Sequence, residues 1–369
     1  MKIKTITCHN VYNYGASLQA YALQEYLLSL GHDVEIIDYR PDYMRVHYDF
    51  WYVPKSSHYY NRAMKSKFFR FLLCCYFARK RYATYGRKLK FDIFTRKYLH
   101  LTKRYLSYQD LIVSPPDADV YIAGSDQIWN CALPNGRDAA YFLQFGIGKI
   151  KRISYAASFA IPEIPETYKE TVKEWLRSFD AISVRERTGL KILESICKKG
   201  VEVLDPVFLL EKSDWVKFSN EGKVRIKNKY ILVYDLYVND GRLEQEAKRL
   251  SSKYNLEIVA VDALIKCQYA KKNISNAGPQ EFVRLIAGAE YVVTNSFHAT
   301  AFSIIFNRPF AVYYNYSNIS RISDILSILG LNNRLNSDLH DYDVNWQDVN
   351  ILLEHAREKS IHFIASNLD

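Results

Sequence analysis

Cysteine is scarce in this chain, and its spacing does not suit a metal site. The 369 residues contain six cysteines, none of them in the C-x-x-C pairs that zinc sites typically use. The one close pair is Cys74-Cys75, and two adjacent positions cannot easily bind one metal ion together. We therefore predict no metal centre, and scattered thiols of this kind favour a reduced, cytoplasmic protein.

Long apolar runs are absent as well. No stretch reaches the roughly 20 apolar residues of a membrane-spanning helix, and Met1-Lys2-Ile3-Lys4 does not open a signal peptide. The hydrophobic share of 49% and the charged share of 24% are typical of a globular protein, so large disordered regions are not expected. The length allows two domains, each with its own core. We expect a soluble protein of two domains inside the cell.

Acidic residues are too few to balance the basic ones. The chain has 50 Lys and Arg against 40 Asp and Glu, a net charge of +10. This balance predicts an anionic partner, which could be a phosphorylated ligand, an acidic polymer or a membrane surface. Tyrosine is abundant, with 30 residues, which suits carbohydrate or interface contacts but also simply packs sheets.

One segment, residues 55–104, concentrates the charge imbalance. It holds fifteen Lys and Arg and a single acidic residue, Asp92. Aromatic residues are interleaved with the charges: Phe68, Phe69, Phe71, Tyr76, Phe77, Tyr82, Phe91 and Phe94. Two interpretations stay open: a solvated helical insertion whose aromatics face the core, or an amphipathic surface for anionic lipid or a diphosphate-linked acceptor. No recognisable nucleic-acid module accompanies the charge, so we expect no nucleic-acid partner.

Strand and helix patterns alternate through both halves of the chain. A strand at residues 3–7, a helix that ends at Gly31 and a strand at residues 34–39 form a parallel βαβ unit. Further apolar strands are predicted in the first half at residues 120–123, 153–157, 181–184 and 201–204. The second half predicts strands at 230–234, 256–261, 291–294 and 310–314, with helices at 242–254, at 279–287 and around His298.

This alternation predicts an α/β protein built from two Rossmann-like domains that face a cleft. We expect the first domain at residues 1–206, on the acceptor side, with the basic aromatic insertion at about 55–104. The second domain is expected at residues 207–345, on the donor side. A helix at residues 346–369 is expected to pack back on the first domain.

The junction after the strand at residues 291–294 is the most informative local feature. The strand ends in Asn295 and Ser296, and Phe297 and His298 open a helix-compatible segment. A helix N-terminus offers unpaired N–H groups and a partial positive charge, which together bind phosphate or carboxylate. We therefore predict a site for a small anion here, with a titratable ring in the first helical turn.

Six segments in order resemble the polysaccharide pyruvyl transferase family. They are NYGASLQAYAL (13–23), AGSDQIWN (123–130), SYAAS (154–158), SVRER (183–187), LDPV (204–207) and NSFHA (295–299). The resemblance covers residues 1 to about 330. It implies a fold similar to the two-domain, GT-B-like glycosyltransferases. It also implies an enzyme that transfers a pyruvyl group from phosphoenolpyruvate to a sugar, usually as a cyclic ketal on two hydroxyls, with no further cofactor.

The resemblance also implies roles on the donor side. His298 becomes the expected acid/base, and Arg185 the expected clamp for a carboxylate or phosphate. Arg187 is a second basic candidate that could equally be an ordinary solvated charge. Asn295, Ser296 and Phe297 would present the donor to the helix end, or only cap it. Many relatives carry an arginine where this chain has Ser296, so either another basic residue substitutes or the donor sits differently.

On the acceptor side, Asp126 is expected to bind or deprotonate a hydroxyl, or else to cap a following helix. Gly124 and Ser125 precede it, and Trp129 could stack on a sugar face or belong to the core. Four residues at the N-terminus of the first helix would meet the acceptor or cap that helix: Asn13, Tyr14, Gly15 and Ser17. His9, on the same loop, is a weaker candidate.

Three functional hypotheses follow. The first is a pyruvyl transferase in the synthesis of bacterial capsule, exopolysaccharide or cell-wall polymer. Its acceptor could be linked to a lipid diphosphate, with the enzyme peripheral at the inner membrane. The second is a glycosyltransferase of the same fold that uses a nucleotide sugar. The third is a polysaccharide- or membrane-binding protein without catalytic activity, for which Ser296 is the main support.

Overall fold

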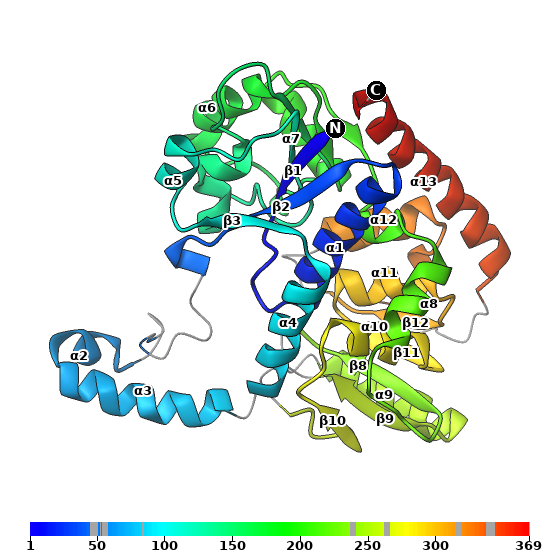
Figure 1. Ribbon diagram of the computed structural model, residues 1–369. Coiled ribbons are helices and arrows are strands. Elements are labelled where there is room, and N and C mark those ends of the chain that lie inside the picture. Colours follow the sequence, from blue (N-terminus) through cyan, green and yellow to red (C-terminus); the bar gives the residue numbers. More distant parts are fainter. Residues whose placement is uncertain are drawn as a thin grey trace.

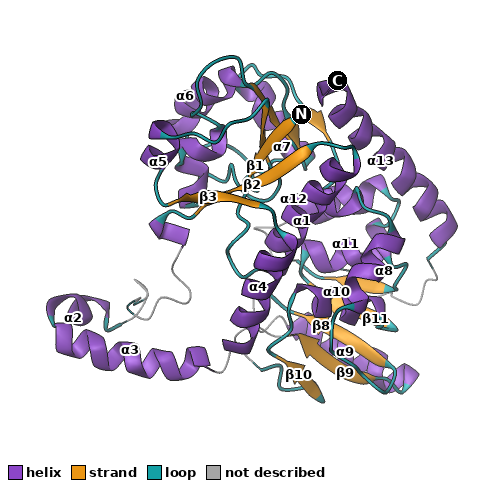
Figure 2. Ribbon diagram, in the orientation of Figure 1, coloured by secondary structure: helices purple, strands orange, loops and turns teal. Residues whose placement is uncertain are grey.

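The computed structural model describes residues 1–44, 51, 53, 58–82, 85–236, 241–261, 266–314, 319–336 and 344–368. Two parallel sheets dominate it, one in each half of the chain (Figures 1 and 2). Helices lie between and around the sheets. This is the predicted α/β architecture of two Rossmann-like domains.

The first sheet has five strands in the order β3-β2-β1-β4-β5, all parallel. Its strands are β1 (Lys2–Ile6), β2 (Asp33–Tyr39), β3 (Leu101–Tyr105), β4 (Val120–Ala123) and β5 (Lys151–Ser154). The short parallel pair β6 (Ser183–Val184) and β7 (Val201–Glu202) joins the β5 edge through single bridges. Strand β3 corrects one expectation, because it places the end of the predicted insertion, residues 101–104, in the sheet.

The second sheet repeats this order as β10-β9-β8-β11-β12, again all parallel. Its strands are β8 (Tyr230–Tyr234), β9 (Glu257–Val261), β10 (Lys272–Ile274), β11 (Tyr291–Thr294) and β12 (Phe310–Val312). Strands β8 and β11 are buried along their whole length, as expected of central strands with helices on both faces. The short edge strand β10 has no counterpart in the sequence prediction.

The longer helices lie close to where the periodicity predicts them. Helix α1 (Tyr14–Ser29) follows β1, and α11 (Phe297–Ile305) follows β11. Further helices of the two domains are α5 (Tyr108–Val113), α6 (Glu166–Trp175), α7 (Arg187–Ser195), α8 (Lys212–Asn220), α9 (Gly241–Tyr254), α10 (Pro279–Ala287) and α12 (Ile319–Ile328). Within the part of the chain described, none is long and apolar enough to cross a bilayer.

The last helix, α13 (Trp346–Leu368), connects the two halves of the molecule. Near its start, Val349 and Leu353 join a cluster that contains residues of the second domain. Near its end, Phe363, Ile364 and Leu368 pack in a cluster with core residues of β1 and α1. Figure 1 shows this helix at the right edge of the molecule, next to α12.

The basic aromatic segment divides into parts with different surroundings. Helix α4 (Tyr85–Tyr98) lies against the body, and Phe91 and Phe94 are buried in the main core. Helices α2 (Tyr60–Lys65) and α3 (Lys67–Tyr82) instead stand away from both sheets (Figures 1 and 2). The core interpretation of the aromatics therefore holds for α4 and does not hold for α3.

Candidate active site

A cleft of about 380 Å³ lies where the carboxyl ends of the two sheets meet. Its first wall follows strands β1 and β4 and includes Cys8, Asn13, Gly15, Asp126 and Gln127. Its second wall follows β8 and β11 and includes Tyr234, Ser296, Phe297, His298 and Arg321. Parallel α/β sheets bind ligands at this end because loops and helix N-termini converge there. The cleft is therefore the candidate active site.

His298 sits in the first turn of α11 and points across the cleft to the start of α1. The ring lies directly against Gly15: a methyl group built on Gly15 would fall 2.0 Å from the His298 Nδ1. Only a residue without a side chain fits there. The N-termini of α1 and α11, from different domains, thus meet at this imidazole, and both direct partial positive charge at the cleft.

The pKa of His298 is lowered from 6.5 to about 4. Burial is the largest cause, because the ring is 8% exposed, and the charges of Arg185 and Arg321 lower the pKa further. Asp205 and Asp126 oppose these effects, with the Asp205 Oδ2 3.7 Å from the His298 Nε2. Among the described atoms this Nε2 has no hydrogen-bond partner. His298 is therefore neutral at pH 7 and able to accept a proton when an anion binds nearby.

This lowered pKa predicts a pH dependence of stability. The unfolded chain binds a proton on His298 near pH 6.5 and the folded chain only near pH 4, so protonation favours unfolding. The contribution of the neutral ring to the free energy of unfolding is fully present above pH 6.5. As the pH falls from 6.5 toward 4, the free energy of unfolding decreases by about 1.4 kcal/mol per pH unit. Denaturant titrations of wild type and His298→Gln should diverge across this window; parallel curves would contradict the shift.

Arg185, the predicted donor clamp, lies behind the cleft rather than in it. Its side chain is 1% exposed, and its Nη1 donates to Asp205 Oδ2 at 2.5 Å. The guanidinium also stacks on the Phe297 ring, 4.9 Å from the centroid. Ser125 is buried in the same cluster, where its Oγ donates to Asp205 at 3.2 Å. Both residues bond to Asp205, which lies beside His298, and neither is part of the described lining of the cleft. The direct binding roles expected for them stay predictions.

Asp126 does line the cleft, in an unusual backbone conformation. Its φ of 77° lies in the left-handed region, which costs a non-glycine residue energy. No helix begins at Asp126, so the alternative role as a helix cap is excluded. The side chain is 20% exposed, and its Oδ1 lies 3.8 Å from the Nη2 of Arg185. The strained turn thus aims a carboxylate at the cleft.

Two predicted acceptor residues belong to packed interfaces instead. Trp129 is fully buried, its ring stacks on Phe142, and its Nε1 donates to the Tyr141 carbonyl at 3.0 Å. It therefore has no face left for a sugar. The Tyr14 ring stacks on Phe282 at 4.3 Å and its hydroxyl donates to a backbone carbonyl of the second domain, so it joins the domains.

Other predicted residues also serve the scaffold. Gly124 has no side chain, which lets the end of β4 lie close to Thr7. The hydroxyl of Ser17 is buried. The His9 Nε2 lies 3.1 Å from the Asp38 Oδ1. The Asn295 amide binds the loop after β8, accepting from Leu236 N at 2.8 Å and donating to Asp235 at 2.6 Å. Arg187 is exposed, donates its backbone N–H to Asp324 of α12 and lies near Glu202. Asn13 and Ser296 accept from backbone N–H groups as caps of α1 and α11, but both also line the cleft.

Arg321 is the residue that sequence reasoning missed. Of the described residues that line the cleft, it is the one lysine or arginine. It comes from α12, is 6% exposed and lies close enough to His298 to lower the pKa of that ring. With its amide oxygen turned toward α12, Gln127 accepts from Arg321 at 3.0 and 3.3 Å. The only signal in the sequence was indirect, namely that Ser296 left one expected cation unaccounted for.

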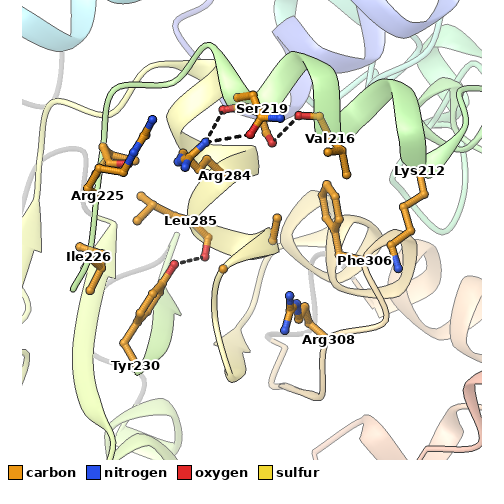
Figure 3. A pocket seen from close by; sticks show the side chains of 14 residues that line it. Lys212, Val216, Ser219, Arg225, Ile226, Tyr230, Arg284, Leu285, Phe306 and Arg308 are labelled. Atoms are coloured by element: carbon orange, nitrogen blue, oxygen red, sulfur yellow. Dashed lines mark hydrogen bonds between the residues drawn. The ribbon is translucent and has the colours of Figure 1, made fainter. Parts of the chain in front are cut away.

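A second hollow of similar size lies away from the cleft, on the second domain (Figure 3). Its described lining has no acidic residue and four basic ones: Lys212, Arg225, Arg284 and Arg308. Two of these donate to carbonyl oxygens at the C-terminal end of α8: Arg284 to Ser219 O in the last turn, at 3.5 Å, and Arg225 to Gly222 O just after the helix, at 2.6 Å. Carbonyls at a helix C-terminus attract cations, so we assign these arginines to capping.

Solved structures support the architecture. Staphylococcus aureus MnaA, solved with UDP, has a TM-score of 0.50 at 13% identity, over 97% of this chain and 87% of that one. A Neisseria meningitidis UDP-GlcNAc 2-epimerase bound to UDP-GlcNAc has a TM-score of 0.48 at 10% identity, over 98% and 94%. Escherichia coli ADP-heptose LPS heptosyltransferase II has a TM-score of 0.36 at 12% identity, over 97% of this chain and 99% of that one. At 13% identity the likeness to MnaA concerns the fold, and it confirms the predicted GT-B-like class.

The comparison of sequences is more specific. No curated protein matches the chain. The family model described as polysaccharide pyruvyl transferase, however, matches residues 13–318. This range includes both walls of the cleft up to α11, from Asn13 to His298. With a match over most of its length, the chain belongs to the polysaccharide pyruvyl transferase family.

Proposed function

We propose that this transferase moves a pyruvyl group from phosphoenolpyruvate to two hydroxyls of a sugar, in the synthesis of a bacterial capsule, exopolysaccharide or cell-wall polymer. The observation that carries the proposal is the group of residues around His298. A neutral imidazole lies between two helix N-termini, with Arg321 and Asp126 in the same cleft. This arrangement suits a donor that is anionic at two places and a reaction that moves protons.

The donor would lie at the N-terminus of α11. Its phosphate and carboxylate need positive partners, which Arg321 and the free N–H groups of the first helical turn can supply. Arg321 would thus take the place of the arginine that many relatives carry where this chain has Ser296. Binding of the anion raises the pKa of His298, so the ring can take up a proton and return it within the same site.

The reaction balances with the residues present. A proton passes to the methylene carbon of phosphoenolpyruvate, and a sugar hydroxyl adds to the central carbon and gives up its own proton. The bond between the central carbon and the bridging oxygen then breaks and inorganic phosphate leaves. A second hydroxyl adds to the same carbon and loses its proton to the departing phosphate, which closes the ketal. We assign His298 to the protons of the methylene carbon and the leaving phosphate, and Asp126 to the acceptor hydroxyl. No further cofactor is proposed.

Thermal stabilisation by the donor tests this proposal without a known acceptor. At about 100 times its Kd, phosphoenolpyruvate should stabilise the wild-type protein by about 2.7 kcal/mol. We expect Arg321→Gln to remove most of this shift in Tm, because the described lining of the cleft then contains no guanidinium. Arg308→Gln, in the second hollow, is the matched control and should keep it. An equal shift in the Arg321 variant would place the donor elsewhere.

The same assay separates the other two hypotheses. A shift with UDP-sugars and none with phosphoenolpyruvate would favour a glycosyltransferase that uses a nucleotide sugar. Stabilisation by neither donor, with binding of polysaccharide retained, would favour a binding protein without turnover. The acceptor is proposed to be a sugar carried on a lipid diphosphate at the inner face of the membrane, which fits the basic character of the chain.

A further inference from the structure

Helices α2 and α3 form a hairpin that projects from the body of the molecule (Figures 1 and 2). The hairpin has a small core of its own, made by Val53, Ala63, Leu73 and Cys74. Because Leu73 and Cys74 lie on one side of α3, that side is already covered by α2. The opposite side of α3 faces away from α2. On this side the Phe71 ring lies 6.2 Å from the ring of Trp51, measured between centroids, and Trp51 is itself 48% exposed.

This outward side of α3 is apolar. Phe68 is 73% exposed, Phe71 45%, Leu72 49% and Tyr76 60%. Their spacing of three, four and eight residues from Phe68 places them along one face of the helix. Cys75, between them, is also exposed. A helix of this length thus has one apolar face buried in the hairpin and a second one open, and large open apolar faces mark interaction surfaces.

The charge around this face selects the partner. Between residues 50 and 91 the sequence contains eleven Lys and Arg and no Asp or Glu. Lys65 at the end of α2 and Lys67 at the start of α3 are both exposed and close to Phe68 in the sequence. Two copies of this hairpin packed face to face would bring like charges together without compensation. An anionic lipid surface instead accepts aromatic side chains at the head-group level and attracts lysine and arginine around them.

We propose that the outward face of α3, formed by Phe68, Phe71, Leu72 and Tyr76, binds the surface of an anionic lipid bilayer. The helix lies parallel to the surface with these four side chains among the head groups, and the lysines contact lipid phosphates. Binding of the hairpin is independent of the chemistry in the cleft. It deepens the proposed function at one point, because it brings the cleft to an acceptor held on lipid.

Vesicle flotation tests this surface in the full-length protein. Wild type should float with vesicles of phosphatidylcholine and phosphatidylglycerol at 7:3 and remain at the bottom with phosphatidylcholine alone. Replacing Phe68, Phe71 and Leu72 by serine should lower the partition coefficient at least about tenfold, because apolar area no longer enters the interface. Ile112, Val113 and Ile147 are exposed apolar residues elsewhere, and their replacement by serine is the matched control.

A charge-reversal pair separates attraction by charge from burial of apolar area. Lys65→Glu with Lys67→Glu should weaken binding at least about 25-fold, since each basic residue near an anionic surface contributes roughly fivefold. Lys199→Glu with Lys227→Glu carries the same change of net charge on the body and should bind nearly as wild type. Circular dichroism confirms that each variant is folded.

Two outcomes would overturn the proposal. One is equal flotation of the triple serine variant and its control. The other is wild-type protein that stays off the vesicles and forms a dimer in solution that the serine substitutions dissociate, because the face would then bind a second copy. Neither outcome depends on phosphoenolpyruvate, so failure of the lipid surface and failure of the proposed reaction are told apart.

Discussion

Gly15→Ala should remove most of the enzyme activity, although it adds only a methyl group. That methyl would lie 2.0 Å from the Nδ1 and 2.3 Å from the Cε1 of His298, which is far inside van der Waals contact. The imidazole, or the start of α1, must therefore move. We expect a fall in kcat of about 10² or more, since displacement of a catalytic group by about 1 Å can have that effect. Steady-state kinetics with phosphoenolpyruvate and a sugar acceptor measure it.

A double-mutant cycle shows whether the effect passes through His298. Gly15→Ala alone should destabilise the fold by about 1–3 kcal/mol, because the contact is overpacked. His298→Ala in the same chain removes the ring and should restore most of this stability without restoring activity, so the two changes are coupled. Gly241→Ala is the control, since a methyl group there meets nothing within 4 Å. Additive effects of the two changes would refute the contact.

His298→Gln should lower kcat by about 10²–10⁴, the range of a general acid or base. The variant keeps a polar side chain at the N-terminus of α11, and Arg321 is untouched. We therefore expect stabilisation by phosphoenolpyruvate to remain close to that of wild type, which separates loss of chemistry from loss of binding. His355→Gln, at an exposed position of α13, is the matched control.

The result also decides between an enzyme and a binding protein. If His298→Gln retains turnover, the ring is a packing partner of Gly15 and another group moves the protons. If it loses turnover and also the shift in Tm with phosphoenolpyruvate, the ring contributes to binding of the donor. Only loss of turnover with binding intact supports the acid/base role proposed here.

The arrangement of Asp205 explains why several motif residues are buried. Asp205 accepts from Ser125 and Arg185 and lies near His298, so one carboxylate connects three segments that are distant in sequence. Burial of this carboxyl raises its pKa, but the charge of Arg185 and the hydrogen bonds from Arg185 and the Val207 N–H outweigh burial and keep the pKa below its usual value. The Arg185 guanidinium thus contacts Asp205, which in turn lies beside His298.

Local features account for what the sequence could predict. The alternation of apolar strands and amphipathic helices indicates parallel sheets, and Pro279 marks the first residue of α10. The junction at Ser296 is equally local, because a cap bonds to N–H groups of its own helix. Short strands are more difficult to predict. β3 and β10 contain too few apolar residues for their pattern to be distinguished from that of the charged segments around them.

Burial, by contrast, depends on what the rest of the chain places nearby. Trp129 and Trp215 are both fully buried. Nothing beside Trp129 in the sequence indicated that Phe142 and Phe159 would cover it. In the same way, the exposed face of α3 and the buried face of α4 come from one continuous pattern of basic and aromatic residues.

By itself the sequence determined the fold class, the family and the helix N-terminus that carries His298, because periodicity, motif order and capping are properties of neighbouring residues. Tertiary structure alone decided which side chains share the cleft. Tertiary packing places Gly15 in contact with the His298 ring and buries Arg185 against Asp205. It also places Arg321, from α12, in the lining of the cleft. The physical reason is that these contacts join the ends of strands from two sheets, and their distances are set by the packing of the domains.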